Sequence, residues 1–152
     1  MSPTDNSRAA VADLLNGLLA NSFALYFKTK NYHWHVTGPR FRDLHLLFDE
    51  QATEIFAITD LVAERARKLG SATLTSIGSV AARQTIRDND DAALGAEAMV
   101  KELADDNQRL AEQLRALKEA ADASSDYATS ALVDTWIDEA EQRIWFLTAT
   151  LQ

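Results

Sequence analysis

Long stretches of helical apolar spacing, with very little glycine or proline between them, most restrict what this chain can fold into. Its 152 residues contain only five Gly and two Pro, which is too little punctuation for a fold of many short strands. Apolar residues recur at steps of three or four, the period of a helix with one buried face. The clearest stripe comprises Val133, Ile137, Ala140, Ile144, Leu147 and Leu151. The sequence therefore predicts an all-α protein.

Four long helices account for most of the predicted structure. The first two are expected at about residues 7–36 and 39–69, the third after an N-cap within 88–90, and the fourth from 124–126. Only the connection 71–87 is long, and a short helix at 79–83 is expected inside it. This order fits a four-helix bundle with one crossover, as in ferritin-like proteins, while an elongated coiled coil is the alternative. We expect one domain over 1–152, with 1–6 as a short flexible N-terminus.

Composition narrows the possible functions. The absence of Cys excludes disulfides, thiolate metal sites and Cys nucleophiles. A net charge of −8 argues against a broad nucleic-acid-binding face and suits a surface or cavity that collects cations. The sequence has neither a run of about 18 apolar residues nor a signal-like N-terminus. We therefore expect a cytoplasmic protein without a membrane segment.

Two pairs of possible metal ligands lie on the second predicted helix, His45 with Asp49 and Asp60 with Glu64. Each pair has i, i+4 spacing, so each can offer two ligands to one ion. The two pairs point roughly the same way but lie about 16 Å apart along the axis, too far to share an ion on one straight helix. Two antiparallel copies across a two-fold axis could bring unlike pairs together. The spacing therefore suggests a metal site shared between subunits.

The alternative to a metal site is an ordinary solvated helix face. Acidic helix faces are usually solvated, and Glu64 could simply pair with Lys68. A histidine and three carboxylates on one stripe bordered by apolar residues favour a cation, because unpaired buried carboxylates are costly. Imidazole and carboxylate ligands without sulfur suit iron, manganese or zinc, and an open carboxylate-rich site favours redox chemistry on iron. No histidine follows a glutamate at i+3, which argues against a di-iron centre inside one bundle.

His33, Trp34 and His35 form a second cluster at the end of the first predicted helix. Residues at i, i+2 face apart on a helix, so at most one of the two histidines can face a metal site. We expect His35 to cap the helix end or to lie exposed. We expect the Trp34 side chain to serve in packing. Its alternative role is to take up an oxidising equivalent beside a redox centre.

Residues 31–70 resemble the signature of the Dps family, the mini-ferritins, and read NYHWHVTGPRFRDLHLLFDEQATEIFAITDLVAERARKLG. The resemblance covers essentially the whole chain, down to the segment 143–147. It implies a hollow homododecamer that is built from two-fold dimers. It implies a ferroxidase that oxidises Fe(II) at di-iron sites and prefers hydrogen peroxide to dioxygen as the oxidant. It also implies storage of ferric oxyhydroxide and protection against oxidative stress. The implied ligands are His33, His45 and Asp49 of one subunit with Asp60 and Glu64 of its two-fold mate.

An acidic interior would supply nucleation sites for the mineral. Glu50 and Glu54 on the same predicted helix are candidates for that lining, and a solvated helix face is the alternative of equal weight. In the resembled family, Asp residues near the start of the last helix line three-fold pores. Asp126 matches one such position, whereas Ala131 stands where an Asp is usual. Asp122 and Asp134 are the alternative pore residues.

DNA binding is the remaining property of the resembled family. It typically needs a Lys-rich terminal arm that neutralises phosphates, yet no Lys precedes Lys28 here and only Arg8 is basic. Twelve chains at −8 each would carry roughly −100, which repels a duplex. We expect no tight DNA binding. The competing readings are a nucleoid-associated, DNA-compacting structural protein and a bundle whose acidic stripe only organises an oligomer.

Overall fold

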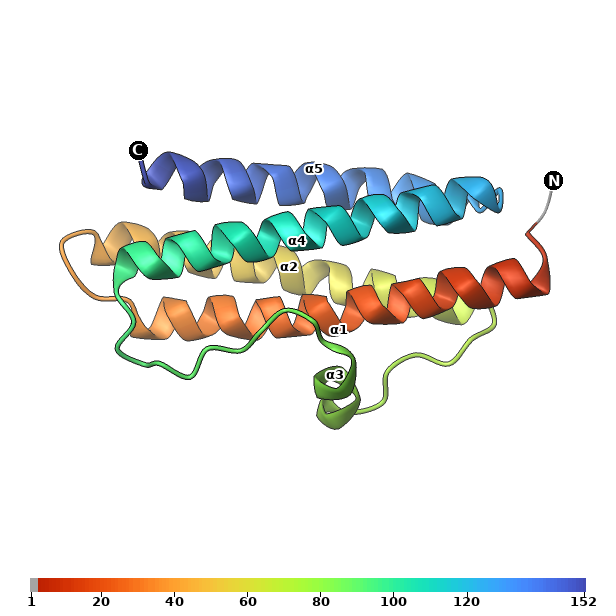
Figure 1. Cartoon of the computed structure of the whole chain (residues 1–152), viewed down its shortest axis with the longest axis horizontal. Coiled ribbons are helices and arrows are strands. Elements are labelled where there is room, and N and C mark those ends of the chain that lie inside the picture. The colour runs from red at the N-terminus through yellow and green to blue at the C-terminus, as the bar shows by residue number, and fades with distance from the viewer. Residues whose placement is uncertain (1–2) are drawn as a thin grey trace.

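The computed structural model describes residues 3–152, and within that range every regular element is helical. Four long helices run side by side, while a fifth, short one lies outside them in the crossover (Figure 1). The all-α prediction and the ferritin-like four-helix arrangement are confirmed. The helices are α1 (Asp5–His35), α2 (Phe41–Lys68), α3 (Ile77–Arg83), α4 (Ala96–Ala123) and α5 (Tyr127–Thr150).

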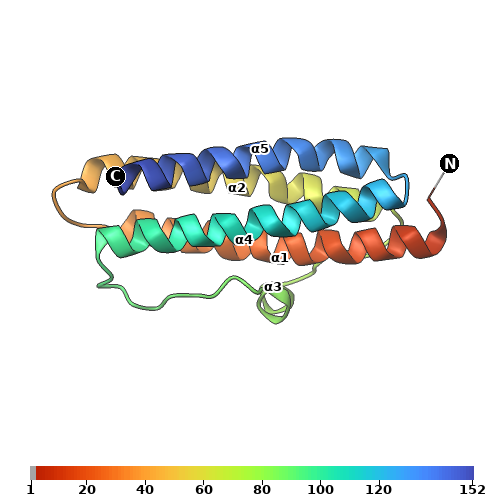
Figure 2. The ribbon, with the colours of Figure 1, turned by 45° about the horizontal axis from the view of Figure 1, so that its top comes forward.

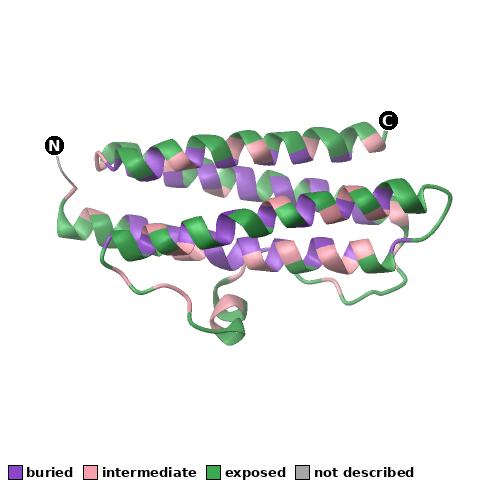
Figure 3. Ribbon diagram, turned by 180° about the vertical axis from the view of Figure 1, so that it is seen from behind, coloured by how far each residue is buried: buried purple, intermediate pink, exposed green. Residues whose placement is uncertain are grey.

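The bundle is built from two helical hairpins. α1 packs mainly on α2 and α4 mainly on α5, and α1 also contacts α4 and α3. A view turned by 45° shows the long helices still aligned, with α3 standing across them beside α1 (Figure 2). Buried positions lie on the sides of the long helices that face one another (Figure 3). Fully buried core side chains include Leu15, Leu25, Phe48, Leu103 and Leu114.

Two helices begin earlier than expected because a hydroxyl group caps each of them. The Thr4 hydroxyl accepts from the backbone N–H of Ser7 at 3.1 Å, so Asp5 and Asn6 lie in α1 rather than in a flexible terminus. Residues 1–2 of that expected terminus lie outside the described residues. Ser76 caps α3, which starts at Ile77 instead of residue 79.

The third long helix begins later than expected, at Ala96, so an N-cap within 88–90 is wrong. The polar residues there bind other parts of the chain instead. The side chain of Asn89 donates to Glu102 on α4 at 2.8 Å and accepts from the N–H of Asp91 at 2.9 Å. Lys28 on α1 donates to the carbonyl of Arg87 at 2.8 Å. These bonds hold the crossover against the bundle.

Asn21 fixes the same crossover from the middle of α1. It is 3% exposed, and its amide oxygen accepts from the N–H groups of Thr85 and Ile86 at 2.8 and 3.1 Å. Its amide nitrogen donates to Gln113 on α4 at 2.9 Å. One buried side chain thus satisfies two loop donors and links α1 to α4, as buried polar groups require.

A buried ionic cluster joins α1 to α4 near this point. The Lys28 ammonium lies 2.8 Å from Asp106 and 3.2 Å from Glu102. The Tyr32 hydroxyl donates to Glu102 at 3.1 Å, and burial together with that carboxylate raises the pKa of Tyr32 well above its ordinary value. Burial would raise the pKa of Glu102, but hydrogen bonds from Asn89 and Lys28 outweigh it and lower that pKa.

Glu102→Gln is expected to lower stability at neutral pH and to flatten the acid end of the stability curve. Because the pKa of Glu102 is lowered in the folded state, its contribution is present above about pH 4.5 and is lost as the pH falls through the lowered value. Thermal unfolding followed by circular dichroism from pH 7 to pH 3 measures this. Glu112→Gln, an exposed carboxylate on the same helix, is the matched control. Parallel pH curves for Glu102→Gln and wild type would contradict the assignment.

Within residues 3–152, α1 alone is long and apolar enough to cross a membrane by length and composition. Half of its most apolar window is buried inside the protein. The buried face of α1 packs on α2 and α4, as expected of a core helix in a bundle.

Candidate metal centre

His33 and His45 face each other across the α1–α2 hairpin. Nδ1 of His33 donates to the carbonyl of His45 at 2.6 Å, and Nδ1 of His45 donates to the carbonyl of His33 at 2.7 Å. The rings stack with centroids 3.9 Å apart and planes 16° apart. Because carbonyl oxygens only accept, both Nδ1 atoms carry the proton in the neutral rings. Each Nε2 therefore keeps a lone pair that can bind a metal ion.

Asp49 lies one helical turn beyond His45 and close to His33, so these three prospective ligands share one part of the chain. Its Oδ1 is 3.7 Å from Nε2 of His33, and its side chain is 45% exposed. The Lys30 ammonium lies 2.7 Å from the same Oδ1. The hydrogen bond from Lys30 lowers the pKa of Asp49, so this carboxylate is held charged beside the imidazoles.

Asp60 and Glu64 are exposed on the same helix and do not reach the histidines. Across the described part of the chain, no group of three or more His, Cys, Asp or Glu side chains is placed to hold a metal ion. Three of the five predicted ligands thus lie near the α1–α2 turn without forming a complete site, and the other two lie farther along α2. A single chain does not assemble them.

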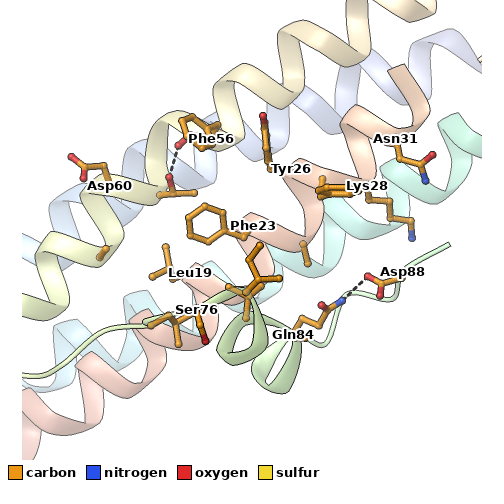
Figure 4. A pocket seen from close by; sticks show the side chains of 18 of the residues that line it. Leu19, Phe23, Tyr26, Lys28, Asn31, Phe56, Asp60, Ser76, Gln84 and Asp88 are labelled. Atoms are coloured by element: carbon orange, nitrogen blue, oxygen red, sulfur yellow. Dashed lines mark hydrogen bonds between the residues drawn. The ribbon is translucent and has the colours of Figure 1, made fainter. Parts of the chain in front are cut away.

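Asp60 borders a large apolar pocket of about 1040 Å³ between the α1–α2 hairpin and α3 (Figure 4). Several of its aromatic and aliphatic side chains face solvent: Phe27 is 64% exposed, Phe56 51% and Ile77 88%. An exposed apolar surface of this kind typically marks a contact with another molecule. Asp60, one residue of the second predicted ligand pair, therefore stands at the edge of this exposed apolar face.

Trp34 and His35 lie beside this group without joining it. Trp34 is 55% exposed, packs edge-on against Phe27 at 6.0 Å and lies 5.9 Å from the Lys30 ammonium. Nδ1 of His35 bonds to the Asn31 carbonyl at 2.9 Å. His35 is thus exposed and bonded at the helix end, and only His33 of the two histidines faces His45.

The two candidate nucleation residues differ in their surroundings. Glu50 is exposed, whereas Glu54 forms an ion pair with Arg143, a guanidinium on α5 that is only 2% exposed. Glu139 lies close by, and burial together with the Glu54 charge raises its pKa. Because Arg143 neutralises Glu54, Glu50 is the less compensated of the two carboxylates. The spacing of α2 alone gave no sign of Arg143, which comes from a distant segment.

Asp126 has a structural position rather than that of an exposed pore residue. It is 4% exposed, accepts from the N–H of Thr129 at 3.2 Å as the N-cap of α5, and pairs with Arg65 at 3.0 Å. Its place in a pore lining stays a prediction, and its burial and its pairing with Arg65 count against it. Asp122 and Asp134 remain more than half exposed, and the Lys118 ammonium lies 4.0 and 2.7 Å from them.

Two basic residues near the candidate sites were missed in the sequence. Lys30 precedes His33 by three residues, a spacing that places both side chains on one helix face. That signal could have been found. Lys118 lies on α4, twelve residues from Ser130 to which it also bonds, and no periodicity within one helix predicts that contact.

Comparisons with known proteins identify the family of this chain. The family model described as Ferritin-like domain matches residues 12–152. A DNA protection during starvation protein of Brevibacillus brevis is 33% identical over 142 residues, covering 93% of this chain and 95% of that protein.

Solved structures give the same result. A Dps protein from Vibrio cholerae, described as a member of a broad superfamily of ferritin-like diiron-carboxylate proteins, superposes with a TM-score of 0.93 at 30% identity, covering 100% of this chain and 98% of that one. Antigen TpF1 from Treponema pallidum superposes with a TM-score of 0.95 at 26% identity, covering 99% of this chain and 96% of that one. The resemblance noted in the sequence is confirmed, and the chain belongs to the Dps family of ferritin-like proteins.

Proposed function

We propose that this chain is a ferroxidase and iron-storage protein whose catalytic sites form between two subunits. The observation that carries the proposal is the separation of the ligands on one chain. His33, His45 and Asp49 gather at one end of the α1–α2 hairpin, while Asp60 and Glu64 stay exposed farther along α2. In an antiparallel two-fold dimer, the group of three on one subunit would meet the pair on the other.

The apolar face beside Asp60 supports the same assembly. Exposed Phe27, Phe56 and Ile77 would lose contact with water when a second copy covers them. We infer that six such dimers form a closed homododecamer, in line with the Dps family. The carboxylates that face its hollow interior, with Glu50 as the first candidate, would nucleate the ferric mineral.

Iron is the substrate of this site. Fe(II) is a hard ion that suits imidazole and carboxylate ligands, and Fe(III) is bound more strongly by the carboxylates. Two neighbouring Fe(II) ions each give one electron to a peroxide molecule. The O–O bond breaks and both oxygen atoms end as hydroxide on the ferric ions. Water then hydrolyses the ferric ions to oxyhydroxide, and that hydrolysis releases the protons. Because the peroxide receives both electrons together, no hydroxyl radical is released. This is the basis of the proposed protection against oxidative stress.

The tuning of the site by its own residues follows from the observed contacts. The reciprocal bonds of His33 and His45 hold both rings through Nδ1 and leave Nε2 of each ring for iron, so the ligand atom is set before iron arrives. Trp34 lies next to His33 in the chain and is a candidate acceptor for a stray oxidising equivalent. We propose that the protein acts in the cytoplasm. We also propose no tight DNA binding, because a net charge of −8 on each chain repels phosphates.

The direct test is an anaerobic Fe(II) titration of the assembled protein followed by either stoichiometric peroxide or air. We expect the ferric absorbance to rise at least about tenfold faster with peroxide, since a two-electron acceptor matches two Fe(II) ions. Fe(II) at the same concentration without protein is the control. Equal rates in peroxide and air would contradict the peroxide preference, and a rate equal to that of free Fe(II) would contradict the ferroxidase.

A further inference from the structure

Arg143 on α5 carries its guanidinium into the core of the bundle, where two other helices bind it. The residue is 2% exposed, although a charged group is costly to bury. Its Nη1 donates to Glu54 on α2, and its Nε donates to Asn107 Oδ1 on α4 at 2.7 Å. Asn107 is buried too, and its amide nitrogen donates to the Leu103 carbonyl at 2.8 Å, which leaves Oδ1 for the guanidinium. Three helices thus converge on one positive charge.

The side chains around this charge offer more acceptor oxygens than it binds. Gln51, at i, i+3 from Glu54, is 4% exposed and donates its amide to the backbone carbonyl of Arg143 at 3.3 Å. Its Oε1 has no hydrogen-bond partner in the described part of the chain, whereas buried acceptors almost always have one. Glu139 lies one turn before Arg143, and burial together with the Glu54 charge raises its pKa. The cluster therefore has both an unpaired oxygen and a second carboxylate.

The donors of this cluster are those of a divalent-cation site. Two carboxylates and two amide oxygens from α2, α4 and α5 form a hard set that suits Mn(II), Mg(II) or Fe(II). Gln51 and Glu54 have the i, i+3 spacing of the Glu-x-x-His ligand pair in the carboxylate metal sites of four-helix bundles. A guanidinium stays charged in proteins, so a divalent ion a few ångström from it would be strongly repelled in this weakly screened interior.

We propose that Arg143 closes a divalent-cation site inside each subunit, whose ligands would be Gln51, Glu54, Asn107 and Glu139. The proposal goes beyond the shared site, because this position belongs to a single chain and has its own ligands. Arg143 is a positioning residue that determines where ions bind, and it touches no iron. Its closure has a chemical benefit. A lone Fe(II) ion there would give peroxide one electron, and the O–O bond would break into hydroxide and a hydroxyl radical within the core.

The test is a Mn(II) titration of the assembled protein, with the free ion measured by electron paramagnetic resonance. All variants carry Asp60→Ala/Glu64→Ala, so that the proposed shared site is absent. Adding Arg143→Gln is expected to create about one Mn(II) site per chain, at least about a hundredfold tighter than in this background, because a unit positive charge has been removed from among the ligands. Arg143→Lys retains the charge and should bind no additional ion. Arg115→Gln removes the same charge from an exposed pair with Glu141, at 3.6 Å, and should also leave binding unchanged.

A further variant locates the new ion. Arg143→Gln/Glu54→Gln in the same background should lose it, because one carboxylate ligand is gone; Mn(II) retained by this variant would place the ion elsewhere and refute the proposal. If Arg143→Gln folds poorly without metal, Mn(II) should raise its thermal midpoint and not that of Arg143→Lys, since an ion that binds only the folded state stabilises it. An Arg143→Gln chain that gains neither bound Mn(II) nor a higher midpoint would overturn the role of Arg143 and leave the shared site standing.

Discussion

Replacing Asp60 and Glu64 together by alanine is expected to remove nearly all catalysed Fe(II) oxidation, at least about a hundredfold in initial rate. After these substitutions each site keeps only His33, His45 and Asp49. The loss of two of five ligands removes most of the affinity for iron. Both side chains are exposed on α2, so each subunit should still fold. Gel filtration checks assembly, and stopped-flow absorbance of the ferric product measures the rate.

A mixing experiment tests whether each metal site takes its ligands from two subunits. A second variant, His33→Gln/Asp49→Asn, lacks the other half of the site and should also be inactive. When the two inactive variants are unfolded and reassembled together, half of the dimers are mixed, and each mixed dimer has one complete site of two. About a quarter of wild-type activity should return.

The same mixture gives a clear opposite result. If all five ligands acted within one subunit, no mixed dimer would contain a complete site, and activity would stay at the level of the separate variants. Reassembly of each variant alone is the control for recovery of the fold. Activity of either variant reassembled alone would show that one half-site suffices, which the geometry of the proposed centre does not allow.

Lys28→Met is expected to lower the free energy of unfolding by about 3 kcal/mol, because it leaves a buried carboxylate without its nearest cation. Lys28 is 6% exposed and Asp106 is 2% exposed. The ammonium is 2.8 Å from Asp106 Oδ2, yet this oxygen has no aligned hydrogen bond, so proximity of charge is what holds the pair. Arg109 contacts only the other oxygen, at 3.2 Å. Denaturant unfolding at fixed protein concentration measures the loss.

The companion variant Lys28→Met/Asp106→Leu removes both charges. Its stability is expected to return to within about 1 kcal/mol of wild type, since apolar side chains of similar volume replace a buried ion pair at little cost. Lys101→Met, at an exposed pair, should stay within about 0.5 kcal/mol of wild type. A single variant as stable as wild type would mean that Asp106 is already compensated elsewhere.

Local pattern was sufficient for much of the fold. Apolar residues at three- and four-residue steps, few glycines and one long connection were enough to predict four helices and a single crossover. Gly70, at φ 90°, ends α2 where the sequence indicated. Start points were less predictable. Thr4 and Ser76 cap α1 and α3, so both helices begin earlier than the spacing predicts. Asn89 does not cap a helix, because its side chain donates to Glu102 on α4.

The sequence by itself determined the helical stripes and the i, i+4 ligand pairs on α2, because both depend only on the pitch of a helix. Only the tertiary structure decided which groups meet across helices. It set the reciprocal bonds of His33 and His45, the burial of Asp126 against Arg65, and the pairing of Glu54 with Arg143. Each of these contacts joins segments distant in sequence or separated by a turn. Their geometry depends on how the hairpins pack, which no spacing within one helix encodes.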